Sequence, residues 1–193
     1  MRRLIHMIAF RLRQYAWIVL AHLRTLCWKL LGMKVGAGTL LPRIRVTWPH
    51  QISLGERCKL EHGISLNFDG SWLPGPAIVI GDDVWIGAGC EFNIHEKIVI
   101  GSHSMIAAGC RFIDSDHGYS DRAIPMRQQV GQKSPILIHE DVWLGANAVV
   151  LKGVTIGRGA IVGAGAIVTK SIPEYEIWAG VPARKLGVRP ASA

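Results

Sequence analysis

The first 55 residues contain no Asp or Glu, although they hold nine Lys and Arg residues. Residues 56–193 hold 13 basic and 14 acidic residues, so the net charge of +8 comes from the front of the chain. Most of the chain therefore lacks the basic surface that would follow a phosphate backbone, and we expect no nucleic-acid partner.

The chain also lacks a long hydrophobic run. The longest uncharged stretch near the N-terminus, between Arg13 and Arg24, has ten residues, which is too short to cross a bilayer. No small-residue cleavage signature follows an unbroken apolar segment, so the sequence shows no signal peptide. The four cysteines do not form a disulfide pattern, because Cys58, Cys90 and Cys110 occupy equivalent inward positions of the repeat described below. These features predict free thiols and a cytoplasmic location.

Metal and nucleotide motifs are missing as well. No His-x₃₋₅-His spacing occurs in the repeat region, and we expect no metal site. The Gly-x-Gly pairs at 157–159 and 163–165 do not open a helix after a strand, which excludes a dinucleotide fingerprint. We expect five histidines to be solvent-facing turn residues: His50, His62, His95, His103 and His139.

What the chain does contain is a six-residue repeat of Leu, Ile, Val or Phe. It occupies fifteen positions: Leu54, Leu60, Leu66, Ile80, Ile86, Phe92, Ile100, Ile106, Phe112, Ile138, Leu144, Val150, Ile156, Val162 and Val168. A helix would need apolar residues at i, i+3, i+4 and i+7 and would be destabilised by so many glycines. A short strand followed by a tight turn fits the repeat, and three such units close a triangular coil. The pattern thus predicts an all-β solenoid with the aliphatic positions inside and small residues at each fifth position.

The repeat divides the chain into three parts. We assign residues 1–34 to a basic amphipathic helical extension, residues 35–172 to the solenoid and residues 173–193 to a C-terminal segment. The repeat is interrupted at residues 69–77 and, for 25 residues, at 113–137. A loop as long as the second one is more often functional than idle.

Residues 2–31 have apolar residues at helical spacing. The stripe consists of Ile5, Ile8, Leu12, Ala16, Val19, Leu23, Leu26 and Leu30. One interpretation is a helix packed along the solenoid or its trimer partners. The other is a helix lying in a membrane interface, with Trp17, Trp28 and six basic residues at the level of the headgroups.

His117, at the start of the long loop, is the candidate catalytic residue. It follows Asp114 and Asp116 in the run Asp-Ser-Asp-His-Gly-Tyr-Ser-Asp at 114–121. A histidine can act as a general base near neutral pH, and a neighbouring carboxylate can hold its tautomer. The other interpretation of the run is a turn in which Asp and Gly are present for backbone geometry.

Four motifs follow the repeat through the last third of the chain: Val-Trp-Leu-Gly-Ala-Asn at 142–147, Gly-Val-Thr-Ile-Gly at 153–157, Ala-Gly-Ala-Ile-Val-Thr-Lys at 164–170 and Ala-Gly-Val-Pro-Ala-Arg at 179–184. With them, the chain closely resembles the hexapeptide-repeat acyltransferases, in the branch of galactoside, maltose and polysaccharide O-acetyltransferases. The resemblance implies a left-handed parallel β-helix, a homotrimer with active sites between subunits, and acetyl-CoA as co-substrate with no permanently bound cofactor.

The resemblance also implies roles for individual residues. His117 matches the catalytic histidine, and Trp143 matches a tryptophan that lines the reaction centre. Gly145, Ala146, Gly163 and Ala164 match backbone positions along the pantetheine arm of acetyl-CoA, whereas Thr169, Lys170, Arg184 and Lys185 match the end that meets the nucleotide. We expect Asn93, Tyr119 and Asp121 to contact the acceptor.

Together these features predict transfer of an acetyl group from acetyl-CoA to a sugar hydroxyl of a surface polysaccharide or lipid-linked glycan. His117 would take the hydroxyl proton, and a turn N–H such as that of Gly145 would stabilise the oxyanion. The protein would act in the cytoplasm at the inner face of the membrane, in peripheral contact through residues 1–31. The alternatives are a zinc-dependent, carbonic anhydrase-like hydratase on the same fold, an N-acetyltransferase of a nucleotide sugar or amino acid, and a non-catalytic scaffold.

Overall fold

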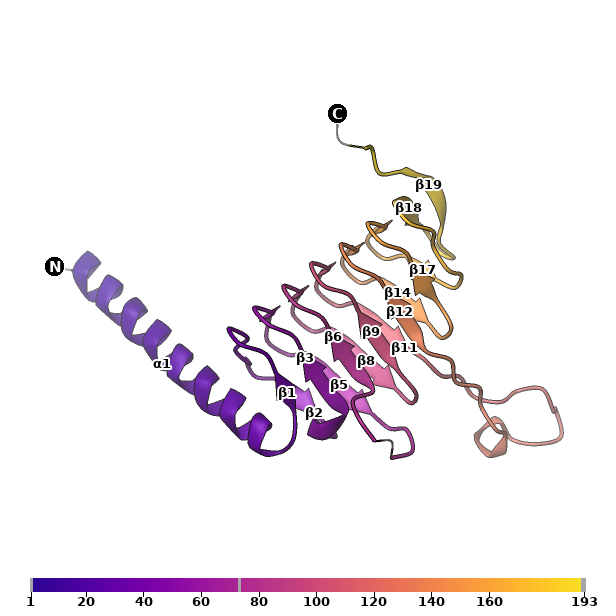
Figure 1. Ribbon diagram of the computed structural model, residues 1–193, viewed down its shortest axis with the longest axis horizontal. Helices are drawn as coiled ribbons and strands as arrows, with labels where there is room; N and C mark the ends of the chain where they lie inside the picture. The colour runs from indigo at the N-terminus through magenta and orange to yellow at the C-terminus, as the bar shows by residue number, and fades with distance from the viewer. Residues whose placement is uncertain (1, 73, 192–193) are drawn as a thin grey trace.

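The computed structural model describes residues 2–72 and 74–191. Helix α1 (Arg2–Leu30) leads into a stack of triangular coils whose strands form three sheets, A, B and C (Figure 1). Sheet A contains β1 (Lys34–Val35), β3 (Ile52–Leu54), β6 (Ile78–Ile80), β9 (Ile98–Ile100), β12 (Ile136–Ile138) and β15 (Thr155–Ile156). Sheet B contains β4 (Lys59–Leu60), β7 (Trp85–Ile86), β10 (Met105–Ile106), β13 (Trp143–Leu144), β16 (Ile161–Val162), β18 (Glu176–Ala179) and β19 (Arg184–Val188). Sheet C contains β2 (Arg45–Val46), β5 (Ser65–Phe68), β8 (Glu91–Ile94), β11 (Arg111–Ile113), β14 (Val149–Leu151) and β17 (Ile167–Val168).

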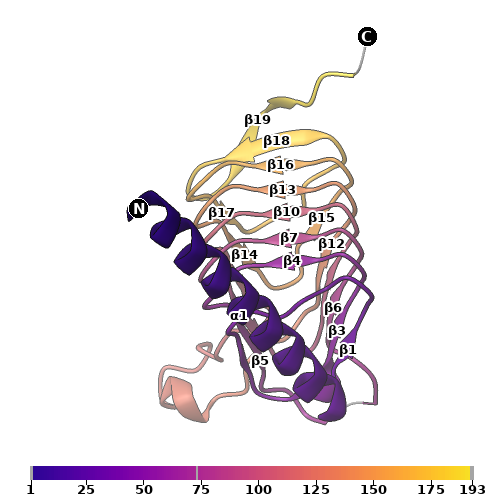
Figure 2. The same ribbon diagram turned by 90° about the vertical axis from the view of Figure 1, so that its left-hand side faces the viewer.

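Every described strand pair is parallel except β18–β19, which closes the far end of sheet B as an antiparallel pair. Each coil runs from sheet A to sheet B to sheet C. In Figure 2, sheet B faces the viewer with later coils above earlier ones, and the chain passes from sheet A on the right to sheet C on the left. The chain therefore winds to the left as it climbs, which makes the solenoid the predicted left-handed parallel β-helix.

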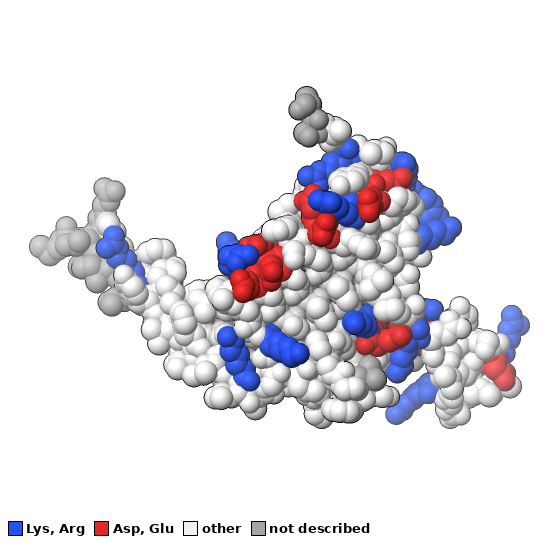
Figure 3. Space-filling view, in the orientation of Figure 1, with Lys and Arg blue, Asp and Glu red and all other residues white. Residues whose placement is uncertain are grey.

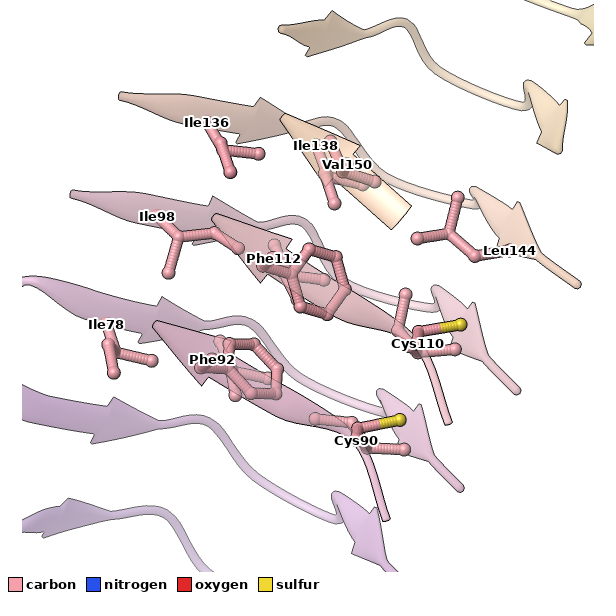
Figure 4. Close-up of a cluster of buried hydrophobic side chains, with 14 of the residues drawn as sticks. Ile78, Cys90, Phe92, Ile98, Cys110, Phe112, Ile136, Ile138, Leu144 and Val150 are labelled. Atoms are coloured by element: carbon pink, nitrogen blue, oxygen red, sulfur yellow. The ribbon is translucent and has the colours of Figure 1, made fainter. Parts of the chain in front are cut away.

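The hexad positions form the core. All fifteen predicted positions are buried, and the most exposed of them, Leu60, keeps 6% of its surface. Equivalent residues stack from coil to coil, as Phe92 and Phe112 do with ring centroids 4.6 Å apart (Figure 4). Cys90 and Cys110 form a second buried column, and all four cysteines are free. The predictions for the aliphatic positions, the small fifth position and the thiols are thus confirmed.

The long loop leaves the corner between sheets C and A. It is shorter than the predicted 113–137, because Ile113 still belongs to β11 and Ile136 already belongs to β12. Its two ends pair antiparallel: Ser115 bridges Lys133, and the Asp116 N–H donates to the Gln132 carbonyl at 3.0 Å. A single turn of 3₁₀ helix, η2 (Met126–Gln128), lies near its tip; a similar turn, η1 (Pro49–Gln51), precedes β3.

Among the described residues, helix α1 contacts the solenoid near its C-terminal end, and its earlier part projects from the first coil (Figure 1). Ala21 and Thr25 are buried, and the Leu41 N–H donates to the Thr25 hydroxyl at 2.9 Å. The predicted apolar stripe faces the other way, since its described large members are 54–80% exposed: Val19, Leu23, Leu26 and Leu30. The side chains of Ile5, Ile8 and Leu12 lie outside the described residues. The expectation that the stripe packs along the solenoid of its own chain is therefore wrong, because Ala21, Thr25 and Trp28 on the opposite side of the helix make that contact instead.

Candidate functional site

His117 lies in the outgoing arm of the loop, four residues beyond the end of β11. It is exposed and lines an open groove of about 490 Å³ at the corner between sheets C and A. The walls of this groove, which we call the corner groove, come from two consecutive coils and the returning arm of the loop. They consist of Asn93, His95, Ile113, Ser115, Asp116, His117, Val130, Gly131 and Lys133.

Asp114 was predicted to orient His117, but its carboxylate binds backbone groups of the preceding coil. It is fully buried, and its two carboxylate oxygens accept the backbone N–H groups of His95, Glu96 and Lys97 at 2.8, 2.8 and 3.0 Å. Asp114 therefore holds the corner of the preceding coil, and it faces the ring of His95 rather than that of His117. The expectation that Asp114 orients His117 is corrected by this geometry.

The Asp116 carboxylate also contacts residues other than His117. Its carboxylate accepts the Gln132 N–H at 3.0 Å and lies 3.1 Å from Lys152 Nζ. The backbone hydrogen bond and then the lysine hold the pKa of the Asp116 carboxyl below its ordinary value. Within the described residues, the His117 ring makes no hydrogen bond or ion pair, so both of its nitrogens face the groove or solvent.

Trp143 lies on a different face of the solenoid from His117. It is 47% exposed on the outer surface of sheet B and lines a hollow of about 220 Å³ with His103, Met105, Ile161 and Arg189, among others. One chain therefore does not bring Trp143 and His117 together.

The three predicted acceptor residues are separated. Asn93 lines the corner groove and accepts a hydrogen bond from the Asn67 side chain at 3.3 Å. Tyr119 is 73% exposed farther along the loop. Asp121 accepts the Ala123 N–H at 2.8 Å and so shapes the loop. Of the three, only Asn93 shares the groove with His117.

The predicted pantetheine contacts do lie together. Gly145–Ala146 and Gly163–Ala164 occupy the corner between sheets B and C in consecutive coils, and the Gly165 N–H donates to the Ala146 carbonyl at 2.8 Å. A Cβ on Gly145 would approach the Ala164 nitrogen to 2.5 Å, so coil stacking by itself explains this glycine. The Gly145 N–H donates to the Val162 carbonyl at 2.7 Å. It is therefore not free to stabilise an oxyanion, and that expectation is wrong.

The predicted nucleotide-end residues fall into two groups. Thr169 and Lys170 are exposed just beyond β17, at the corner between sheets C and A. Arg184 and Lys185 lie on β19, where Lys185 is paired with Glu176 and Arg184 donates to the Ala183 carbonyl at 2.8 Å. Because the Ala183 N–H donates to the Ile167 carbonyl at 2.8 Å, this second group sits over the start of β17, while Lys170 lies past its end.

Two histidines do not behave as solvent-facing turn residues. The His95 ring is 33% exposed and lines the corner groove, with Nδ1 2.9 Å from the Ser115 hydroxyl. The His50 Nε2 is buried beneath the end of α1. Sequence analysis could have found His95 only through the strand register, because the pairing of Asn93 with Ile113 places His95 beside Ser115. Within residues 2–72 and 74–191, no three His, Cys, Asp or Glu side chains are placed to share a metal ion.

Comparison with known proteins identifies the repeats. Residues 135–170 match the bacterial transferase hexapeptide model, and residues 77–111 match the hexapeptide repeat of succinyl-transferase. The probable acetyltransferase Rv3034c of Mycobacterium tuberculosis is 38% identical over 155 residues, which are 79% of this chain. The aligned part is 47% of that protein, so the chain spans about half the length of this relative.

Solved structures share the fold. A mutant form of AntD, an N-acyltransferase of Bacillus cereus, in complex with dTDP-4-amino-4,6-dideoxyglucose and coenzyme A, superposes with a TM-score of 0.73 at 23% identity. The match covers 84% of this chain and 87% of AntD. The hexapeptide-repeat acetyltransferase VCA0836 of Vibrio cholerae, complexed with acetyl coenzyme A, gives a TM-score of 0.62 at 25% identity, over 87% and 77% of the two chains. This chain thus shares its fold with structures that contain coenzyme A or acetyl coenzyme A.

Proposed function

We propose that this chain, which belongs to the hexapeptide-repeat acyltransferases, transfers an acetyl group from acetyl-CoA to a hydroxyl of a sugar or glycan. The observation that carries the proposal is His117, an exposed imidazole that makes no hydrogen bond or ion pair with any described residue and that shares a groove with Asn93. The bound thioester of VCA0836 and the sugar nucleotide of AntD support the classes of donor and acceptor.

The chemistry needs little from the protein beyond position and one base. A thioester is already activated, so no covalent enzyme intermediate is required. In our proposal, His117 Nε2 or Nδ1 removes the hydroxyl proton as the oxygen attacks the thioester carbon, and coenzyme A leaves as a thiol after taking up that proton. Holding both substrates in the groove provides the remaining acceleration.

The test is His117→Ala in the full-length protein, with His139→Ala as the matched control. His139 is an exposed histidine on a turn outside the corner groove. Loss of a general base should lower kcat by about 10²–10⁴, whereas the control should keep wild-type turnover. The assay is release of free coenzyme A with a panel of sugars, p-nitrophenyl glycosides and dTDP-linked amino sugars. Turnover of His117→Ala within a few-fold of wild type would refute the assignment, and exclusive use of amino sugars would identify an N-acetyltransferase.

We further propose a homotrimer with the active site between subunits. The outer faces of sheets A and B are rich in apolar side chains, which include Val79, Val99, Leu137, Trp85, Met105, Trp143 and Ile161. The outer face of sheet C is mainly polar from β2 to β11, with Arg111 paired to Glu91 at 3.2 Å, and becomes apolar only at Val149, Leu151 and Ile167. A site that contains both His117 and Trp143 requires two copies of the chain, because the two residues lie on different faces of one copy.

Light scattering tests the trimer. We expect a trimeric mass for the active enzyme and dissociation when Met105→Glu places a charge in the apolar face of sheet B. A monomeric mass for fully active protein would contradict the proposal.

Our third proposal places α1 on an anionic membrane. The outward stripe of Val19, Leu23, Leu26 and Leu30 leaves apolar surface in water, and at about 100° per residue Arg11 and Lys29 fall on one side of it. Arg13 and Arg24 fall on the other side.

Figure 3 shows basic but no acidic side chains along the helix on the face in view, in keeping with the absence of acids before Glu56. An apolar face flanked by cations suits a helix that lies in the headgroup layer, with the acceptor presented at the inner face of the membrane. No helix in the described part of the chain is long and apolar enough to span a bilayer.

Liposome sedimentation tests this placement. We expect the wild type to sediment with vesicles that contain phosphatidylglycerol, less so at high salt, and not with pure phosphatidylcholine. Leu23→Ser with Leu26→Ser should abolish sedimentation without changing the trimer. If the wild type stays in solution with the anionic vesicles at low salt, the stripe is instead covered by protein and the membrane proposal fails.

A further inference from the structure

His95 approaches His117 from the preceding coil. It follows β8, whose register pairs Asn93 with Ile113, so His95 lies beside Ser115 at the mouth of the loop. Both histidines line the corner groove, one from its coil wall and one from its loop wall. The groove thus offers two imidazoles, of which the proposed reaction uses one.

The orientation of the His95 ring is fixed along one edge. Its Nδ1 lies 2.9 Å from the Ser115 hydroxyl and 3.7 Å from the carboxylate of Asp114. The same carboxylate accepts the His95 backbone N–H at 2.8 Å, which anchors the backbone of the residue as well as its ring. A buried carboxylate beside Nδ1 favours a proton on that nitrogen, because the proton lies close to the negative charge.

A proton on Nδ1 leaves Nε2 as a hydrogen-bond acceptor. The ring is 33% exposed, and within the described residues its second nitrogen makes no hydrogen bond, so this acceptor is available to a ligand in the groove. A hydroxyl group is a suitable partner, since it can donate one hydrogen bond and remain neutral.

We infer that His95 is a second acceptor-binding residue, which accepts a hydrogen bond from a hydroxyl neighbouring the one that is acetylated. Ser115 is its positioning residue. This inference rests on the proposed function and narrows it, because it selects acceptors with at least two nearby hydroxyls, as in a sugar ring, over isolated alcohols.

Two conservative variants distinguish the contributions of the two ring nitrogens of His95. In His95→Gln the side-chain amide reaches about as far as Nε2, whereas in His95→Asn it reaches only as far as Nδ1. Full-length variants are assayed with the best acceptor of the p-nitrophenyl glycoside panel and with its monodeoxy analogues. Loss of one neutral hydrogen bond corresponds to about a two- to tenfold change. We expect His95→Ala and His95→Asn to raise the acceptor KM by that factor, His95→Gln to recover most of it, and the KM for acetyl-CoA and the pH profile to stay as in wild type.

The deoxy acceptors give the deciding result. One monodeoxy analogue should be a poorer substrate than the parent for the wild type but equal to the parent for His95→Ala, because the hydrogen bond is already lost. Should His95→Ala fail to fold, Ser115→Ala serves in its place, with the same expected rise in acceptor KM. An unchanged acceptor KM in the variants, with wild-type transfer to the sugar, would overturn the role of His95 alone. Absence of transfer by the wild type to every acceptor in the panel would overturn the proposed function and this inference together.

Discussion

Replacing Asp114 tests whether this carboxylate organises the backbone beside the corner groove. Its two oxygens accept three backbone N–H groups, from His95, Glu96 and Lys97, and the carboxylate itself is fully buried. Asp114→Ala removes both oxygens and therefore all three hydrogen bonds at once. Asp114→Asn keeps one oxygen but points an amide donor at N–H groups that are donors themselves. Both variants should therefore disturb the backbone that carries His95.

The size of the effect follows from the number of donors. A backbone N–H that loses its partner in a buried place destabilises the fold by about 1–3 kcal/mol. Water can reach part of this corner, since the Glu96 and Lys97 side chains are exposed, so we take the low end for each donor. We expect about 3–5 kcal/mol for Asp114→Ala and about 2 kcal/mol for Asp114→Asn. For a chain of this size, about 1 kcal/mol lowers Tm by roughly 2–4 °C.

The assay combines thermal unfolding with hydrogen exchange. The control is Asp69→Asn, because Asp69 is an exposed loop carboxylate that accepts no hydrogen bond among the described residues. Exchange should accelerate at the amides of residues 95–97 in the Asp114 variants and remain unchanged in the control. If Asp114→Asn unfolds at the same temperature as Asp69→Asn with protected amides, the structural role assigned to Asp114 is wrong.

Three further predictions concern the coil edges and the loop stem. Gly145→Ala should lower the stability by about 1–3 kcal/mol in thermal unfolding, since its Cβ would lie 2.5 Å from the next coil, whereas Gly187→Ala, with open space around its Cβ, should be neutral within about 0.5 kcal/mol. Lys170→Ala should raise KM for acetyl-CoA more than KM for the acceptor in steady-state kinetics, and the reverse pattern would place the donor elsewhere. The lowered pKa of Asp116 contributes stability that is present above its ordinary value of 3.8 and is lost as pH falls through the lower folded value. Lys152→Met should therefore reduce the fall in Tm between pH 5 and pH 2, and an unchanged acid profile would show that the ion pair contributes nothing.

Much of the fold could be predicted from the sequence because the repeat is a one-dimensional signal. A position such as Phe92 or Val150 points inward whatever the neighbouring coils contain, since each coil repeats the same turn geometry. The place of His117 at the start of the loop followed from where the repeat stops. The sequence was a poorer guide to its partners, because Asp114 and Asp116 are neighbours in the chain but bind to other coils and to the returning arm of the loop.

The coil, the inward positions and the basic N-terminal part of the chain could be predicted without a structure, because they depend on local period and composition. The residues that share the corner groove could not, since the stacking of coils brings His95 beside Ser115 although 20 positions separate them. The structure was also needed to show which side of α1 is exposed. Both sides carry apolar residues, and the docking of Ala21 and Thr25 on the first coil leaves the leucine stripe facing outward. In both cases the contact joins segments that are distant in the chain, and a repeat of six residues does not specify how such segments meet in space.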